Sequence, residues 1–145
     1  MKTVALRFSD NFAPDLGTIS AHNAVIQKYG FVWYGKLGAV VSKKVIDDIL
    51  KNEKPRILLI HSGKADRYWA YIEKIQYELP DEKYIPSYYR DNAGIFKTWF
   101  KIVNIESAPG NILGKCKVAS SKRQLSEVSK SSMNPYFIID VEEEK

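Results

Sequence analysis

Seven aromatic side chains lie next to expected strand ends or in one long loop, where they are free to line a cleft: Trp33, Tyr34, Tyr68, Trp69, Tyr84, Tyr88 and Tyr89. Four cations lie within a few positions of these rings: Lys36, Lys64, Arg67 and Arg90. Proteins bind unpaired nucleotides with rings that stack on the bases, at about 1–3 kcal/mol per base, and with cations that hold the phosphates. The pattern therefore predicts an aromatic base-binding pocket with these four cations as its phosphate-binding rim.

Each of these rings has packing in the core as its alternative role. Trp99 lies in the middle of an expected strand, so we expect its ring to be buried and structural. For Trp33, and for the neighbours Tyr88 and Tyr89, the sequence leaves core packing and ligand binding equally open.

Few residues are suited to catalysis or to metal binding. The chain has two histidines, His22 and His61, one cysteine and no CxxC or HExxH motif, so no metal site is expected. Phosphate-binding glycine loops of the GxGxxG and GxxxxGK types do not occur. His61 and Ser62 are neighbours on an extended chain and point apart, which does not suit a nucleophile and its base. We predict no cofactor and no enzymatic activity.

The charge of the chain indicates an anionic partner. Lys and Arg number 22 and Asp and Glu 17, for a net charge of +5, and three of the acids are residues 142–144. Without residues 141–145, the body carries 21 basic and 14 acidic side chains, or +7. Such a surface attracts polyanions, nucleic acid first among them, although a basic surface also serves solubility.

Membrane insertion and secretion are not expected. The longest apolar runs, such as residues 57–60, are far shorter than the ~20 residues of a spanning helix. The first eight residues contain charges and no cleavage site, unlike a signal peptide. Cys116 is the only cysteine, which excludes an internal disulfide and favours a reducing compartment. We expect a cytoplasmic protein with no membrane contact.

Short apolar segments predict an α+β domain. We expect strands over residues 3–8, 31–34, 56–61, 68–78, 95–106 and 136–141, with a tyrosine-rich loop over 79–93. Helices are expected over 21–29, between Ser42 and Pro55, and near 122–130, with Ser20, Ser42 and Ser121 as caps. About six strands with two or three short flanking helices fit a mostly antiparallel sheet curled into a barrel. The length suits one domain, residues 1–141, with an acidic tail or the start of a linker at 142–145.

Three stretches resemble known domains. Residues 57–63, Ile-Leu-Leu-Ile-His-Ser-Gly, resemble a strand of EVE domains that ends in His-Ser, and residues 67–75 resemble the next strand, with Tyr-Trp-Ala where those families often place a glycine. Residues 96–105 resemble the YTH strand with a central tryptophan, and residues 8–11 and 31–33 match the YTH order of strand, polar loop, helix and cage tryptophan. The chain thus resembles the PUA-like superfamily and, within it, the EVE and YTH domains that read modified bases.

The resemblance implies roles for particular residues. Trp33 would form one wall of an aromatic cage, and Tyr88 or Tyr89 another, where YTH cages commonly use tryptophans. The other residues expected around the base are Tyr34, Trp69, His61, Ser62, Ser9, Asp10 and Asn11. Residues 9–11 would approach the edge of the base, and residues 61 and 62 would lie near the floor of the pocket.

The function implied by the resemblance is recognition of a flipped, modified base, such as 6-methyladenine or a methylcytosine. Burying a methyl group contributes about 0.8 kcal/mol, and cations offset the cost of extruding the base. DNA is the expected partner in preference to RNA. The chain has the size of the targeting module in modification-dependent restriction systems of the McrB type, in which an AAA+ motor is fused or associated.

Two other functions remain open. One is an RNA-binding or RNA-processing PUA-like enzyme that uses His61, with Ser62, Tyr68 or Lys64 as neighbours. The other is a protein-interaction module whose loop rings bind another chain. Turnover lost in His61→Ala would favour the enzyme, and salt-insensitive binding to a protein would favour the interaction module.

Overall fold

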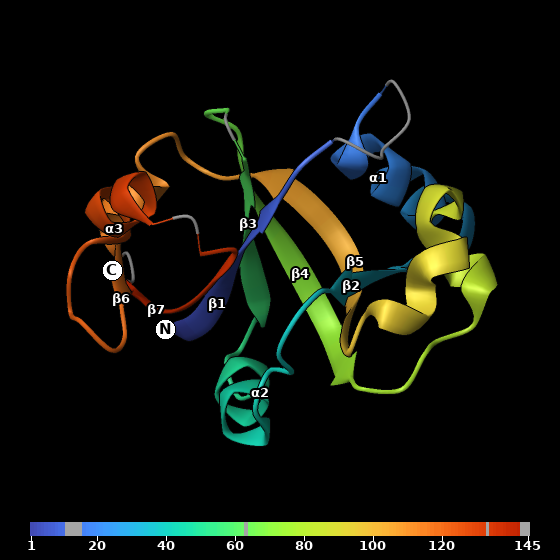
Figure 1. Cartoon of the computed structure of the whole chain (residues 1–145), viewed down its shortest axis with the longest axis horizontal. Coiled ribbons are helices and arrows are strands. Elements are labelled where there is room, and N and C mark those ends of the chain that lie inside the picture. The colour runs from blue at the N-terminus through green and yellow to red at the C-terminus, as the bar shows by residue number, and fades with distance from the viewer. Residues whose placement is uncertain (11–15, 63, 133, 143–145) are drawn as a thin grey trace.

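The computed structural model describes residues 1–10, 16–62, 64–132 and 134–142. Within these ranges seven strands form one sheet, with three α-helices and three short 3-10 helices around it (Figure 1). The strands are β1 (Lys2–Phe8), β2 (Val32–Lys36), β3 (Arg56–His61), β4 (Arg67–Gln76), β5 (Thr98–Ser107), β6 (Cys116–Val118) and β7 (Tyr136–Val141). The helices are α1 (Thr18–Tyr29), α2 (Lys43–Leu50), η1 (Glu82–Tyr84), η2 (Ser87–Ile95), η3 (Ile112–Lys115) and α3 (Leu125–Ser131).

The strands follow the order β2-β5-β4-β3-β1-β7-β6. Every neighbouring pair is antiparallel except β1 and β3, which run parallel because α1, β2 and α2 intervene between them in the chain. The predicted α+β class is therefore confirmed. In the described part of the chain, no pairing joins the edge strands β2 and β6, so the sheet curves without closing into a barrel.

Several elements differ from the prediction, and β5 begins at Thr98 where a strand from residue 95 was expected. α1 begins at Thr18, so Ser20 lies within the helix and is not its cap. α3 begins at Leu125 after Gln124, and Ser121 does not cap it. β6 is a strand that the sequence analysis did not predict, because three residues are too few to establish an alternating pattern. Ser42 does cap α2, since its hydroxyl accepts a hydrogen bond from the backbone N–H of Val45.

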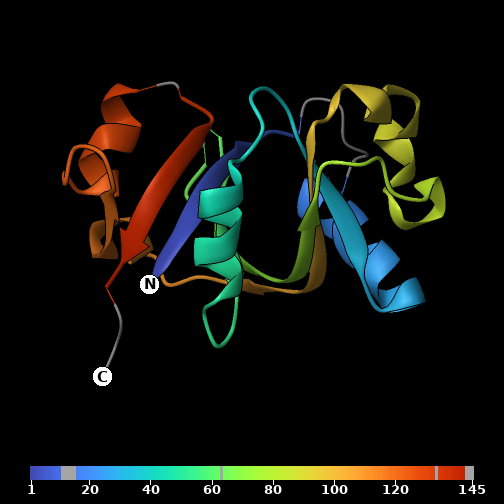
Figure 2. The same ribbon diagram turned by 90° about the horizontal axis from the view of Figure 1, so that it is seen from below.

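One face of the sheet carries the main apolar cluster. Alternate residues of five strands point to it because successive side chains of a strand face opposite sides, and they include Val4, Leu6, Val32, Tyr34, Ile57, Leu59, Ile72, Phe100 and Ile102. α2 adds the fully buried Ile49 to this cluster. Figure 2 shows α2 between the β1 side and the β2 side of the curved sheet, which identifies this face as the inner one.

The outer face is covered by two separate groups of elements. α3 and η3 pack on the β1, β3 and β7 side, where Leu125 and Ile112 contact the cluster that contains Trp69. The loop segment with η1 and η2 covers β2 and β5, where Ile85 and Ala93 pack with Trp33 and Trp99. Trp99 has no exposed surface, which confirms its expected structural role. The tyrosine-rich loop is therefore a folded cover for the sheet, and this cover also reaches the inner-face cavity described next.

Candidate functional site

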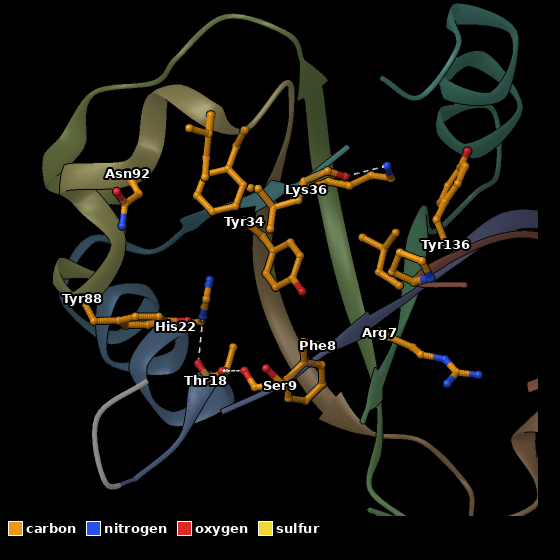
Figure 3. Close-up of a pocket in the computed structure, with 16 residues that line it drawn as sticks. Arg7, Phe8, Ser9, Thr18, His22, Tyr34, Lys36, Tyr88, Asn92 and Tyr136 are labelled. Atoms are coloured by element: carbon orange, nitrogen blue, oxygen red, sulfur yellow. Dashed lines mark hydrogen bonds between the residues drawn. The ribbon is translucent and has the colours of Figure 1, made fainter. Parts of the chain in front are cut away.

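A cavity of about 760 Å³ lies at the inner face, beside the ends of β1 and β2 (Figure 3). Its walls come from β1, β2, α1, η2 and the start of β7, which are distant in sequence. Six rings line it: Phe8, His22, Tyr34, Tyr88, Phe96 and Tyr136. Among the described residues that line it there is no Asp or Glu, whereas Arg7 and Lys36 are both present. The cavity is therefore aromatic and free of carboxylates within the part of the chain that the structure describes.

The aromatic wall depends on a close approach at Gly35. A Cβ atom at this position would lie 2.7 Å from Cγ of Phe96, so only glycine allows that ring to sit against β2. The Phe96 ring in turn meets the Trp99 ring edge-on, with 5.4 Å between ring centres. The buried tryptophan cluster of the outer face thus supports one wall of the cavity.

Tyr34 and His22 supply the buried polar groups of the cavity. Burial raises the pKa of the Tyr34 phenol, so its hydroxyl keeps its proton and remains a hydrogen-bond donor. The ring of His22 lies 5.1 Å from the Tyr34 ring and is fully buried, and burial lowers its pKa to about 4. Nδ1 of His22 lies 2.8 Å from the carbonyl oxygen of Thr18, which places the proton of the neutral ring on Nδ1 and leaves Nε2 as an acceptor.

Asp10 fastens α1, and with it His22, to the end of β1. One oxygen of its carboxylate accepts from the backbone N–H of Thr18 at 2.9 Å, and the other lies 2.5 Å from Nε2 of His61 at the end of β3. The hydroxyl of Thr18 donates to the carbonyl of Ser9 at 3.0 Å. These contacts lower the pKa of Asp10 to about 2, the hydrogen bond from Thr18 being the larger cause and that from His61 the next. Asp10 therefore holds the cavity wall in place from outside the lining.

The Asp10→Asn variant should show a weaker dependence of stability on acid than the unaltered protein. The carboxylate pKa is about 2 in the fold and 3.8 ordinarily, so its contribution to stability is complete above about pH 5 and is lost as the pH falls toward 2. The two proteins should differ in free energy of unfolding near neutral pH and converge near pH ~2. Urea unfolding across this range measures the effect, with the exposed α2 residue changed in Asp47→Asn as control. Parallel curves for Asp10→Asn and the unaltered protein would contradict it.

Lys36 lines the cavity, and its ammonium is already bound by backbone carbonyls of the protein. Its Nζ donates to the carbonyls of Leu37 at 3.0 Å and Ala39 at 2.7 Å, and lies 4.4 Å from the centre of the Tyr136 ring (Figure 3). Burial lowers the pKa of this ammonium. The expected phosphate-binding role of Lys36 does not fit these contacts, because its donors hold the 37–39 turn and are turned away from solvent.

The other predicted phosphate-binding cations lie outside the cavity. Lys64 belongs to the turn between β3 and β4, and Arg67, the first residue of β4, donates to the carbonyls of Lys64 and Asp66 in that turn. This turn lies beside the end of β1, because His61 pairs with Phe8. Lys64 is exposed there. Arg90 donates through Nε to the carbonyl of Ile85 and lines a second, smaller groove against α1.

The structure divides the predicted base-contacting residues into two groups. Those that line the cavity are Ser9, Tyr34 and Tyr88. His61 lies behind Phe8, where its ring nitrogens face Asp10 and the carbonyl of Ser62, and neither His61 nor Ser62 lines the cavity. Asn11 and the side chain of Tyr89 lie outside the described residues.

Trp33 and Trp69, both expected beside the base, are core residues. Trp33 is 7% exposed and packs under the loop with Ile85, on the face of β2 opposite Tyr34. Trp69 is 3% exposed in the cluster below α3, with the Arg56 guanidinium 3.9 Å from its ring centre. The physical reason is the two-residue repeat of a strand, which turns the side chains of neighbours such as Trp33 and Tyr34 toward opposite faces of the sheet.

Several lining residues were not predicted from the sequence. They include Phe8, Thr18, His22, Asn92, Phe96 and Tyr136. A signal existed for one of them, since a glycine within a strand marks close approach and Gly35 allows the contact with Phe96. The others come together only because β7 and α1 are placed next to β1 by tertiary pairing.

A family model described as Pua-like matches residues 4–143. The chain therefore belongs to the PUA-like family, and the predicted PUA-like membership and α+β class are confirmed. Domains of this family generally bind nucleic acids. Comparisons with curated proteins and with solved structures returned no match. In the described part of the chain, no helix is long and apolar enough to cross a membrane, and no group of three or more His, Cys, Asp or Glu side chains is placed to hold a metal ion.

Proposed function

We propose that this domain binds nucleic acid and holds one extruded, modified base in the cavity beside β1 and β2. The observation that carries the proposal is a cavity of about 760 Å³ with six lining rings, in a basic PUA-like domain. This volume lies within the roughly 300–1,000 Å³ of pockets that bury small organic ligands. Rings on several sides suit a planar guest, because every base has two faces on which to stack.

The buried polar groups of the cavity suit the edge of a base. The Tyr34 hydroxyl is a donor, and burial keeps the His22 ring beside it neutral. Asn92 lines the same cavity and its amide offers both kinds of group. Nucleobases carry donors and acceptors on the same edge, so this combination favours a base over a purely apolar ligand.

We propose that the bound base is methylated and belongs to DNA. The apolar rings of Phe8 and Phe96 beside the phenols offer a surface on which a base methyl group is buried, at about 0.8 kcal/mol. DNA as the nucleic acid, and a targeting role in a modification-dependent restriction system with a motor protein, are proposed from the likeness of residues 8–11 and 57–63 to EVE and YTH domains.

We propose binding without catalysis. The histidine considered as a catalytic base, His61, contacts Asp10 and the Ser62 carbonyl through its two ring nitrogens and does not line the cavity. His22 lines the cavity, but its Nδ1 is engaged by the helix carbonyl of Thr18. These contacts support a structural role for both rings.

Titration of labelled oligonucleotides at several salt concentrations tests the proposal. We expect binding that weakens with salt, with modified bases preferred about fourfold per buried methyl, the equivalent of about 0.8 kcal/mol. Lys64→Ala should weaken all oligonucleotides alike and reduce the salt slope by about 0.7–0.9, as for one lost phosphate contact. No affinity for any single- or double-stranded oligonucleotide, modified or not, would refute the proposed function.

A further inference from the structure

Large apolar side chains are exposed at the mouth of the cavity. Leu37 and Ile95 both line it, and each is 57% exposed. Val40, in the same turn as Leu37, is also exposed. Leu37 follows β2, which carries Tyr34, and Ile95 ends η2, which carries Tyr88. Leu37 and Ile95 are therefore positioned by the same elements that form walls of the cavity.

The turn that presents Leu37 is held at both of its ends. At its start, the ammonium of the buried Lys36 binds the carbonyls of Leu37 and Ala39. At its far end, the backbone N–H of Val41 donates to the Thr98 hydroxyl at 3.1 Å, and the Val41 carbonyl accepts from the Tyr77 hydroxyl. With its carbonyls bound, the turn keeps the Leu37 side chain in solvent beside the cavity.

A solvent-facing leucine held at the mouth of this cavity is suited to a role in extruding a base from a double helix. Extruding a base from a double helix leaves a gap in the stack, and proteins stabilise such gaps with apolar side chains inserted between base steps. Resting on the proposed function, we infer that Leu37, together with Ile95, is a wedge that fills the space vacated by the extruded base. The inference assigns double-stranded nucleic acid as the substrate, because a single strand has no such gap.

Leu37→Ser tests this inference when single- and double-stranded ligands of one sequence are compared. Affinity for the duplex should fall about tenfold, and affinity for the single strand should fall much less, because only the duplex has a gap to fill. A duplex with a mismatch at the target base should lose less, since that base is extruded at lower cost. Leu79→Ser is the matched control, because Leu79 is 58% exposed and does not line the cavity.

The possible results separate this inference from the proposed function. An equal loss for single and double strands, no loss in Leu37→Ser, or the same duplex-specific loss in Leu79→Ser would overturn the wedge and leave base binding in place. Failure of the unaltered protein to bind any oligonucleotide would overturn both. A fluorescent base analogue placed opposite the target gives a second readout, because Leu37→Ser should reduce its change in emission in a duplex that is saturated with protein.

Discussion

Trp33→Ala is expected to lower the free energy of unfolding by about 3–5 kcal/mol, the usual cost of removing a large buried aromatic side chain. Trp33 is 7% exposed and packs with Ile85, Ala93 and Trp99 on the outer face of the sheet. Its removal leaves a void between β2 and the loop cover that the surrounding chain fills only in part. Urea unfolding followed by circular dichroism measures the loss.

Trp33→Ala also tests whether the Trp33 side chain acts in core packing or in base binding. The fraction of Trp33→Ala that remains folded should bind nucleic acid with unchanged selectivity for a modified base, because Trp33 does not line the cavity. Trp33→Phe keeps an apolar ring in the cluster and should recover much of the stability, which provides a folded protein if alanine is not tolerated. A stable Trp33→Ala protein with a selective loss of modified-base binding would show that Trp33 takes part in base recognition and would contradict this prediction.

Tyr88→Ala is expected to raise the Kd for a modified oligonucleotide about 5- to 150-fold, which corresponds to the 1–3 kcal/mol of one base stack. Tyr88 is half-buried, lines the cavity and is hydrogen-bonded with the Thr18 side chain, while burial raises the pKa of its phenol. Removing the ring takes away one wall and leaves the sheet intact. Fluorescence anisotropy at fixed salt measures the change.

Tyr84→Ala is the matched control for this prediction. Tyr84 lies in the same loop, but its ring packs on Phe31 at 4.6 Å and on Tyr29 at 5.1 Å between ring centres, and it does not line the cavity. Tyr88→Phe should keep most of the affinity if stacking is the main contribution. Equal losses in Tyr84→Ala and Tyr88→Ala would show that the loop acts through its fold and not through a ring in the site.

The helix boundaries show where local sequence rules are sufficient and where they are not. The Ser42 cap and the left-handed Gly30 at the end of α1 follow from residues adjacent to the helices, and both could be predicted. The start of α1 could not, because the carboxylate that binds its first N–H belongs to Asp10, eight residues upstream. A cap supplied across a loop has no fixed spacing from which it can be recognised.

Local sequence rules predicted an even smaller part of the site than of the helix boundaries. The sequence predicted that rings and cations near strand ends would meet, and Tyr34, Tyr88, Ser9 and Lys36 do line one cavity. Nearness along the chain also predicts Trp33 and Trp69 in this site, but neither residue lines the cavity. The two-residue repeat of strands separates these residues onto opposite faces.

The amino-acid sequence by itself determined the α+β class, the basic charge, most strands and the PUA-like family, because these depend on composition, local alternation and short motifs. Tertiary structure alone decided which aromatic rings face the cavity and which are buried under the loop. Each ring-bearing strand has two apolar faces, and the packing of η1 and η2 on one of them leaves Tyr34 on the other, where Phe8, His22 and Tyr136 arrive from distant parts of the chain.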